Sequence, residues 1–302
     1  MKILIICFSQ TGNTLKVAKS LRQGLNEVAD SCDLVDFADF DIEKLSEYDL
    51  VGLGCPVFYY REPFNISEFI NNLRDLQGQH WFVFCSHGSI LGLTLISMTD
   101  KLEKKGAIVL GSHHTYADAT FPSLPHPTIT TGHPDSQDLQ EAKEFGKTIA
   151  RCSQALASGD RNSITKPAPV TEIWVPEEAA VLTPEIMAQI MPRLSINRER
   201  CNNCGDCQDS CPVNGIDLET EPPRIQNPCI YCWYCAKICP TCAIEADWNM
   251  MVKMMKDQFP RLIQALKDAE CRGEFRWLID PETINLDDPL YKQRERKIQK
   301  EG

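Results

Sequence analysis

A repeated cysteine pattern constrains this chain more than any other feature of its sequence. Eight of the 15 cysteines lie between Cys201 and Cys239, and they follow the spacing C-x2-C-x2-C-x3-C-P twice. Each position of the second copy lies 28 residues after its counterpart (229 − 201 = 28). We therefore expect a duplicated unit whose two copies pair about a pseudo-two-fold axis.

Thiolates at these spacings indicate iron–sulfur chemistry. Iron favours soft thiolate ligands, and two-residue gaps let one loop reach three corners of a cubane cluster. Structural zinc is the alternative, because paired C-x2-C units also build zinc sites. Zinc sites rarely combine three cysteines at successive two-residue gaps with a following Cys-Pro, so we favour clusters.

The segment from Leu194 to about Trp248 resembles the bacterial two-cluster ferredoxins. The resemblance implies a small α+β domain with two [4Fe–4S] clusters, in which the fourth cysteine of each copy ligates the other cluster. The first cluster would be held by Cys201, Cys204, Cys207 and Cys239. The second would be held by Cys229, Cys232, Cys235 and Cys211.

Four other residues of the second copy have expected roles. Tyr231, Trp233 and Tyr234 are predicted to shield a cluster from water rather than to bind a substrate. Cys242 takes the place of Asn214 in the first copy, and we expect it to be a small buried thiol.

Strand and helix patterns alternate through the first half of the chain. Apolar runs typical of strands occur at residues 2–8, 32–37, 48–58, 80–85 and 107–110. Helices are predicted at residues 13–28, 66–76 and 91–105, and a last one begins near Asp135, a good N-cap. This alternation predicts an α/β fold with a doubly wound, five-stranded parallel sheet, which binds ligands beyond the carboxyl ends of its strands.

The loop after the first predicted strand is a candidate phosphate site. A helix follows it at once, so backbone amides and the positive end of the helix dipole would face an anion. The loop has no Lys or Arg and lacks the G-x-x-x-x-G-K pattern, which favours a phosphate monoester over a triphosphate. Gly52 and Gly54 lie inside a predicted strand, so the dinucleotide-binding pattern is absent as well. An ordinary helix cap is the alternative. The loop comprises Ser9, Gln10, Thr11, Gly12, Asn13 and Thr14.

This loop strongly resembles the phosphate loop of flavodoxins, and residues 1–158 match that family's order of strands and helices. The resemblance implies bound FMN and the strand order 2-1-3-4-5. Ser9, Thr11, Asn13 and Thr14 would hold the phosphate, and Gly12 would allow its close approach. Two more loops would flank the flavin ring, namely Cys55, Pro56, Val57, Phe58, Tyr59 and Tyr60, and Ser86, His87, Gly88 and Ser89.

His87 is the candidate catalytic residue of these loops. A histidine can give a proton or hydrogen bond to reduced flavin near neutral pH; a solvated loop histidine is the alternative. One of the aromatic residues at 58–60 is expected to stack on the ring. Cys55 and Cys85 are either redox-active thiols or, as we favour, small buried hydrophobes.

Further segments have weaker expectations. His113 and His114 follow the fifth predicted strand and could line the pocket, and the proline-rich loop at 121–133 would cover the flavin or a substrate. Residues 159–194 are predicted to be a proline-rich connector with a short helix at 184–191, followed by the ferredoxin domain at 195–248. Residues 249–302 are predicted to be a helical extension with a basic tail, and a solvated helix end is favoured there over a site for anionic partners.

Composition excludes several classes of function. The 302 residues carry 31 Lys and Arg against 42 Asp and Glu, a net charge of −11, which argues against a general nucleic-acid binder. No apolar run approaches the ~20 residues of a membrane span, and the start lacks the features of a secretory signal. We therefore expect a cytosolic protein with reduced thiols.

Taken together, the two halves resemble the flavodoxin–ferredoxin fusion proteins of anaerobic bacteria and archaea. A flavin exchanges one or two electrons and each cluster exchanges one, so the fusion predicts an iron–sulfur flavoprotein oxidoreductase that reduces a small acceptor at FMN. The alternative is an electron carrier without its own substrate, whose acidic surface docks to redox partner proteins. A ferredoxin-type donor or acceptor and a second copy of the chain are the candidate partners. A non-redox metal scaffold is disfavoured by the cysteine spacing.

Overall fold

The computed structural model describes residues 1–160, 177–220, 223–226 and 229–301, and these form two compact units. The first unit comprises Met1–Asp118 with Gly132–Ala180, and the second comprises Ala119–Thr131 with Val181–Gly302. Residues 161–176 of the predicted connector lie outside the described residues.

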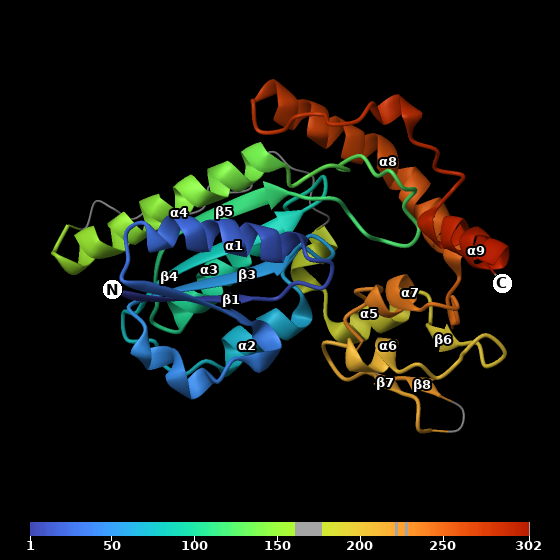
Figure 1. Ribbon diagram of the computed structural model, residues 1–302, viewed down its shortest axis with the longest axis horizontal. Coiled ribbons are helices and arrows are strands. Elements are labelled where there is room, and N and C mark those ends of the chain that lie inside the picture. The colour runs from blue at the N-terminus through green and yellow to red at the C-terminus, as the bar shows by residue number, and fades with distance from the viewer. Residues whose placement is uncertain (161–176, 221–222, 227–228, 302) are drawn as a thin grey trace. The chain divides into compact units, whose positions relative to one another are not determined.

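The first unit contains a five-stranded sheet in the order β2-β1-β3-β4-β5, and every neighbouring pair is parallel (Figure 1). The strands are β1 (Lys2–Cys7), β2 (Ser31–Asp36), β3 (Leu50–Pro56), β4 (His80–His87) and β5 (Ile108–Tyr116). The predicted fold class and strand order are confirmed. The central strands are apolar without interruption because helices cover both of their faces.

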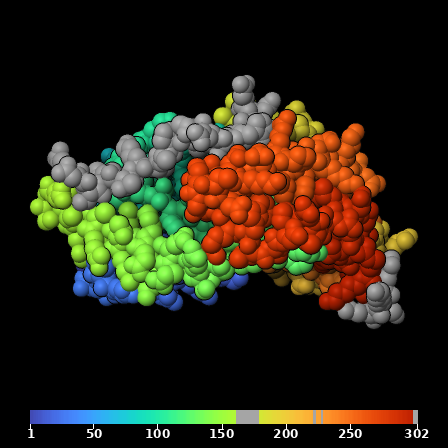
Figure 2. All heavy atoms as spheres, turned by 90° about the horizontal axis from the view of Figure 1, so that it is seen from above, coloured from blue at the N-terminus to red at the C-terminus, as the bar shows by residue number. Residues whose placement is uncertain are grey.

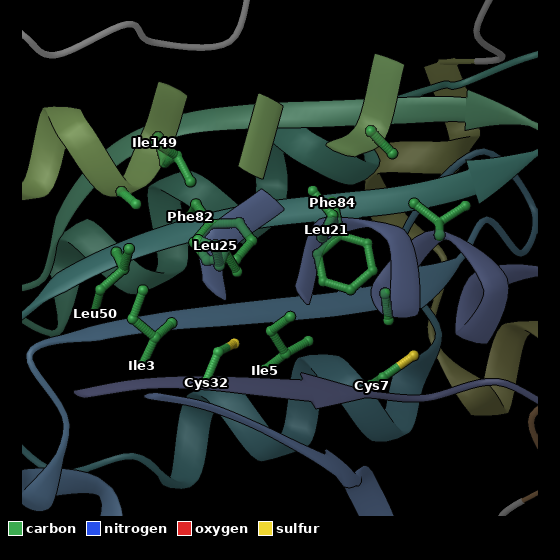
Figure 3. Packing of buried hydrophobic residues seen from close by; sticks show 14 of the residues in the cluster. Ile3, Ile5, Cys7, Leu21, Leu25, Cys32, Leu50, Phe82, Phe84 and Ile149 are labelled. Carbon is green, nitrogen blue, oxygen red and sulfur yellow. The ribbon is translucent and has the colours of Figure 1, made fainter. Parts of the chain in front are cut away.

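Helices α1 (Asn13–Asn26) and α4 (Ser136–Ala157) cover one face of the sheet, and α2 (Phe64–Asn72) and α3 (Thr94–Lys104) cover the other (Figure 1). Figure 2 shows α4 in yellow-green along the surface of this unit. Between α1, α4 and the sheet lies a core of buried side chains (Figure 3). It includes Ile3, Ile5, Leu21, Leu25, Phe82, Phe84 and Ile149.

Two glycines let α1 and α4 approach closely. A Cβ on Gly24 would lie 1.9 Å from the carbonyl oxygen of Lys143, and one on Gly146 would lie 2.5 Å from that of Leu21. Gly52 and Gly54 serve packing as well, because Cβ atoms there would lie 2.2 and 2.0 Å from the rings of Phe82 and Phe84. These strand glycines therefore make room for aromatic rings of the neighbouring strand.

The second unit repeats one small motif. Strand β6 (Ser195–Ile196) pairs antiparallel with β9 (Ile244–Glu245), and β7 (Ile216–Asp217) pairs with β8 (Arg224–Ile225). Helices α6 (Asp206–Asp209) and α7 (Tyr234–Ile238) begin 28 residues apart (234 − 206 = 28). The strand that precedes each copy thus pairs with the strand that ends the other copy.

Helices flank the repeat, and all of them lie in the second unit. These are α5 (Pro184–Ile190), α8 (Trp248–Cys271) and α9 (Leu290–Glu301). Short 3-10 helices occupy Phe37–Asp39, Ile42–Glu47, Glu177–Val181 and Pro281–Thr283. None of the helices in the described part of the chain is long and apolar enough for a bilayer crossing.

The segment Ala119–Thr131 connects β5 to α4 of the first unit but belongs to the second. Pro125 forms a β-bridge with Pro289, and the Leu290 N–H donates to the Leu124 carbonyl at 2.7 Å. The ring of Phe121 lies edge-on to that of Trp233, with centroids 5.6 Å apart. The residues that contact this segment lie more than 100 positions away in the sequence, so no local sequence pattern indicates these contacts. The predicted covering of a flavin or substrate by residues 121–133 stays a prediction.

Candidate flavin and iron–sulfur sites

The loop at residues 9–14 forms an anion cradle at the start of α1. Gly12 is the N-cap residue, with a left-handed backbone (φ 89°) and no side-chain cap for the helix. A Cβ on Gly12 would meet nothing within 4 Å, so the space beside the loop is open. The first N–H groups of a helix have no acceptor within the helix, and the dipole is positive there. The cradle therefore fits a phosphate group.

Three side chains of this loop tie it to neighbouring segments. Ser9 Oγ accepts a hydrogen bond from the Leu15 N–H at 3.1 Å, and Thr14 Oγ1 shares one with Ser86 Oγ at 2.7 Å. Asn13 Nδ2 donates to the carbonyl oxygen of Asp118 at 3.1 Å. These bonds fix the cradle against the carboxyl ends of β4 and β5, where a doubly wound sheet binds its ligand.

The aromatic turn, residues 58–61, follows β3. The backbones of Phe58 and Arg61 exchange hydrogen bonds of 2.9 and 3.1 Å, which places Tyr59 and Tyr60 at the tip. Both tyrosines have left-handed backbones (φ 52° and 67°), a conformation that costs a non-glycine residue about 1 kcal/mol. Strain of this kind gathers at functional sites.

Two contacts hold the aromatic turn in place. The Leu93 N–H donates to the Tyr60 carbonyl at 2.6 Å, and a Cβ on Gly92 would lie 2.1 Å from that oxygen. Phe58 packs edge-on against Phe8, with centroids 6.4 Å apart. Of the three aromatic residues, Phe58 is therefore part of an internal aromatic contact.

His87 is buried, with 4% of its surface exposed, so the alternative of a solvated loop histidine is wrong. Its Nδ1 lies 2.8 Å from the Gly88 carbonyl, and its Nε2 lies 2.9 Å from Nδ1 of His114. The ring of Tyr116 is 4.5 Å from the His87 ring by centroids. A carbonyl only accepts, so Nδ1 of His87 carries a proton.

Burial lowers the pKa of His87 well below its usual value, and the neighbouring His114 lowers it further. The ring is therefore neutral near pH 7, and its Nε2 has a lone pair. It follows that Nδ1 of His114 is the donor in the contact between the two rings. Both tautomers are thus defined by the surroundings.

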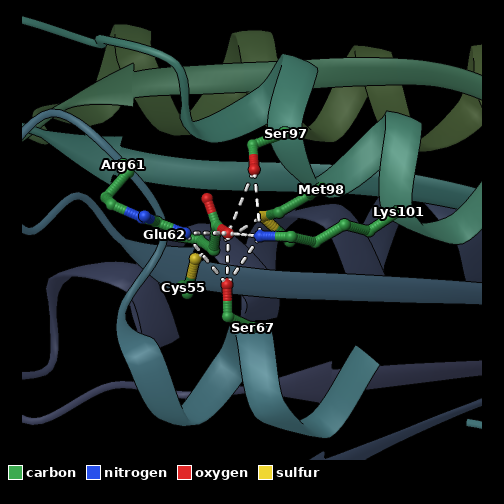
Figure 4. Close-up of polar contacts among 7 residues, drawn as sticks. All are labelled: Cys55, Arg61, Glu62, Ser67, Ser97, Met98 and Lys101. Carbon is green, nitrogen blue, oxygen red and sulfur yellow. Dashed lines mark hydrogen bonds and ion pairs between the residues drawn. The ribbon is translucent and has the colours of Figure 1, made fainter. Parts of the chain in front are cut away.

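Glu62, fully buried, anchors the chain directly after the aromatic turn. Its Oε1 bonds to Lys101 and Ser67, and it lies 3.1 Å from Ser97 Oγ and 3.3 Å from Arg61 Nη2 (Figure 4). Burial raises the pKa of Glu62, but the adjacent Lys101 charge and these hydrogen bonds bring it below its usual value. An ionised carboxylate therefore joins the start of α2 to α3.

Cys55 and Cys85 are both fully buried. Burial raises the pKa of each thiol well above its usual value, so both stay protonated. Cys55 Sγ lies 3.6 Å from Sδ of Met98 in α3. Protonated, buried thiols behave as small hydrophobes.

Two hollows in the second unit are each lined by four cysteines. The first hollow has Cys201, Cys204, Cys207 and Cys239 in its wall. The second hollow has Cys211, Cys229, Cys232 and Cys235 in its wall. Among the described residues, no group of three His, Cys, Asp or Glu side chains is arranged to hold a single metal ion. Each hollow thus combines three cysteines of one copy with the fourth of the other, a donor set that fits a four-iron cluster.

Backbone N–H groups point at the sulfur atoms in the same way in both copies. Cys211 Sγ accepts from the Gly215 N–H at 3.1 Å, and Cys239 Sγ accepts from the Ala243 N–H at 3.2 Å. At Cys239 burial pushes the pKa up, but hydrogen bonds from Thr241 and from backbone amides bring it below its usual value. Such bonds stabilise a thiolate, the form that ligates iron.

The two copies share a backbone conformation but not the residues that suit it. Left-handed positions recur 28 residues apart, as the pairs Asn203 and Tyr231, Gly205 and Trp233, and Asn214 and Cys242. Asn and Gly tolerate this conformation well, whereas Tyr, Trp and Cys do not. Trp233 lines the second hollow and packs against Tyr231, Trp248 and Phe121. The second copy therefore accepts backbone strain and gains aromatic packing.

Several site residues carry no signal in the sequence. His114 and Lys101 matter through contacts with His87 and Glu62, which lie 27 and 39 positions away along the chain. A buried Glu62 is also unexpected, because an ion pair with a distant lysine leaves no periodic pattern.

Family models match both halves of the chain. The model described as "Flavodoxin domain" matches residues 4–112, and the model described as "4Fe-4S dicluster domain" matches residues 193–240. Among solved structures, a flavodoxin from the domain Archaea is 22% identical over 51% of this chain and 99% of that one, with a TM-score of 0.42.

Curated relatives match each half separately. A Clostridium beijerinckii flavodoxin is 26% identical over 48% of this chain and 97% of its own length. An NAD(P)H dehydrogenase (quinone) of Archaeoglobus fulgidus is 27% identical over 51% of this chain and 98% of its own. An uncharacterized ferredoxin of Methanocaldococcus jannaschii is 30% identical over 15% of this chain and 74% of its own. The chain therefore contains a flavodoxin domain followed by a 4Fe–4S dicluster domain, and these two domains indicate an electron-transfer protein.

Proposed function

We propose that the chain is an iron–sulfur flavoprotein oxidoreductase. It passes electrons between two [4Fe–4S] clusters and FMN, and it reduces a small acceptor at the flavin. The observation that carries this proposal is the pair of hollows, each lined by four cysteines, on a chain that also has a phosphate cradle. The 15 free cysteines fit a reducing compartment, for which we propose the cytosol.

In this proposal each hollow holds one cluster through its four thiolates. Each cluster would supply one-electron transfer at low potential. The amides of Gly215 and Ala243 stabilise negative charge on the sulfur atoms of Cys211 and Cys239. The aromatic group around Trp233 excludes water from one hollow, and that burial tunes the potential.

FMN would lie at the carboxyl ends of β1, β3 and β4. Bound flavin would supply both one-electron and two-electron chemistry. The N–H groups of Asn13 and Thr14 at the start of α1 and the exposed Thr11 would bind its phosphate, while Ser9 and the Thr14 side chain hold the loop in shape. The strained aromatic turn presents Tyr59 and Tyr60 as the candidates to contact the ring.

The two histidines can hold and move a proton beside this site. His114 donates through Nδ1 to Nε2 of neutral His87, and His87 holds its own proton on Nδ1 against the Gly88 carbonyl. A proton taken up by the His114 ring lets His114 pass its Nδ1 proton to His87. His87 thus has a source of protons although it is itself buried.

A small acceptor is favoured by one of the relatives, which is described as an NAD(P)H dehydrogenase (quinone). The second candidate function is a carrier that docks to redox proteins. The net charge of −11 favours that role, since charge complementarity speeds transient docking. Chemically reduced protein, mixed with quinones and other small oxidants, separates the two. Multiple turnovers with a small molecule support the enzyme; flavin reoxidation by redox proteins alone supports the carrier.

Iron, sulfide and flavin analysis tests the cofactors directly. Protein purified without oxygen is expected to hold about eight iron atoms and one FMN per chain. A colourless protein containing zinc contradicts the proposal.

A matched pair of variants tests the ligand sets. Cys239→Ser is expected to perturb the cluster held by Cys201, and Cys211→Ser the cluster held by Cys235. Cys242→Ser, which changes a thiol outside both sets, is expected to leave both spectra unchanged. Spectroscopic loss of the opposite cluster in either ligand variant overturns the assignment.

A further inference from the structure

Arg294 of the C-terminal helix α9 binds the second copy of the duplicated motif. Its guanidinium donates to the carbonyl oxygens of Ala236 and Cys239, the latter at 2.7 Å. In the first copy the corresponding carbonyls, of Gln208 and Cys211, accept backbone N–H groups of Cys211 and Asn214 at 3.1 and 3.2 Å. The Cys239 carbonyl accepts the equivalent backbone N–H, that of Cys242, at 3.2 Å, so the bond from Arg294 is an addition in the second copy. The described contacts therefore break the pseudo-symmetry with a fixed positive charge.

The Arg294 charge is held at the backbone of one cluster-lining cysteine, Cys239. Cys239 belongs to the hollow that Cys201, Cys204 and Cys207 also line. Arginine stays protonated at every accessible pH, and its two-pronged bond holds the charge in one position. The neighbouring Glu295 is itself paired with Arg200 at 3.3 Å, which partly neutralises its charge.

We propose that Arg294 selectively raises the reduction potential of the cluster held by Cys201, Cys204, Cys207 and Cys239. The inference rests on the proposed function, because it requires that both clusters form. Reduction adds one electron to a cluster, supplied by an external one-electron donor, and no bond is formed or broken. A nearby cation stabilises the more negative state, and the effect weakens with distance.

Other charges also act on the two clusters, so the inference concerns the contribution of Arg294 alone. Asp206 and Asp209 belong to α6 of the first copy, and Lys237 takes the place of Asp209 in the second. Their side chains remain unchanged in a variant of Arg294. A change confined to one potential therefore reports on Arg294.

The test is a redox titration of the full-length holoprotein, with both clusters followed by electron paramagnetic resonance. Arg294→Gln is expected to lower one of the two cluster potentials and to leave the other unchanged. Arg294→Lys, which keeps the charge, is expected to give a smaller shift. Arg296→Gln is the matched control: it removes the same charge from the same helix, where the exposed Arg296 binds the half-buried Asp288 at 2.7 Å. Cys204→Ser identifies the affected cluster.

Four outcomes overturn the inference. They are no shift in Arg294→Gln with full iron content, equal shifts of both clusters, an equal shift in Arg296→Gln, and an equal shift in Arg294→Lys. If Arg294→Gln loses iron, the titrations of Arg294→Lys and Arg296→Gln still test the inference. A cluster potential in Arg294→Lys that lies far from that of the unmodified protein contradicts an effect of charge. Wild-type protein without iron contradicts the proposed function instead, so the two failures are distinguishable.

Discussion

Nε2 of His87 lies 2.9 Å from Nδ1 of His114, inside the first unit. Because the Gly88 carbonyl holds the other ring nitrogen of His87, that ring can accept only from His114. The neutral form of His87 is therefore the native form. A second neutral histidine lies on the same strand as His114: His113, whose ring stacks on Phe145 with centroids 5.2 Å apart.

The neutral His87 and His113 predict that the first unit loses stability in acid. Burial and the neighbouring His114 lower the pKa of His113 to about 3, against the opposing charge of Asp138, and they lower that of His87 as well. The unfolded chain therefore binds more protons than the folded one between pH 6.5 and about 3. The free energy of unfolding should fall as pH drops through this window, by up to about 1.4 kcal/mol per pH unit for each histidine.

Hydrogen exchange of the β4 and β5 amides at pH 7, 6 and 5 measures this dependence in the intact chain. His113→Phe keeps the stacking on Phe145 and should flatten the pH dependence, whereas His126→Gln on an exposed site should not. An unchanged slope in His113→Phe contradicts the role of that histidine.

The Glu62 and Lys101 pair predicts strong coupling in a double-mutant cycle. Lys101→Met leaves a buried carboxylate without its main partner, which should cost about 3–5 kcal/mol of unfolding free energy. Glu62→Gln combined with Lys101→Met should recover much of that loss. Chemical unfolding measures all four proteins; additive losses would show that the pair does not act as a unit.

Gly12→Ala should weaken FMN binding about tenfold or more. Its new Cβ enters the open side of the phosphate cradle, and the positive φ adds about 1 kcal/mol of strain. Gly159→Ala is the matched control, since Gly159 also has a positive φ (101°) and open space around it but follows the far end of α4. Titration of flavin-free protein with FMN, read by fluorescence, should show a weakened affinity in Gly12→Ala alone.

The strand order followed from the resemblance to flavodoxins. Local patterns predicted the parallel sheet, the first three helices and the repeat, because each depends on residues that are near one another in the sequence. They placed the end of the fifth strand at Leu110, whereas β5 continues to Tyr116. Polar residues there, such as His113 and Thr115, satisfy one another at 3.0 Å within the strand, so the apolar signal ends before the hydrogen-bonded ladder does.

Long-range contacts account for what the sequence did not predict about the sites. The basic tail was expected to be a solvated helix end, yet Arg294 binds the carbonyls of Ala236 and Cys239, more than 50 positions away. Nothing distinguishes Arg294 from Arg296 in a run of basic residues. The cysteine sets were accessible to sequence reasoning because their spacing resembles that of two-cluster ferredoxins, in which the fourth cysteine of each copy ligates the other cluster.

The strained backbone of the second copy predicts opposite effects for two substitutions toward the first copy. Trp233→Gly relieves about 1 kcal/mol of strain but removes a fully buried side chain worth about 3–5 kcal/mol, so the variant should be less stable by about 2–4 kcal/mol. Cys242→Asn relieves similar strain at a half-buried position and should stabilise by up to about 1 kcal/mol. Denaturant unfolding of the holoprotein, followed by iron–sulfur absorbance, measures both. Faster iron loss in air is expected only for Trp233→Gly, because its ring lines the second hollow. Equal iron loss in the two variants would show that the packed Trp233 ring does not protect the cluster from air.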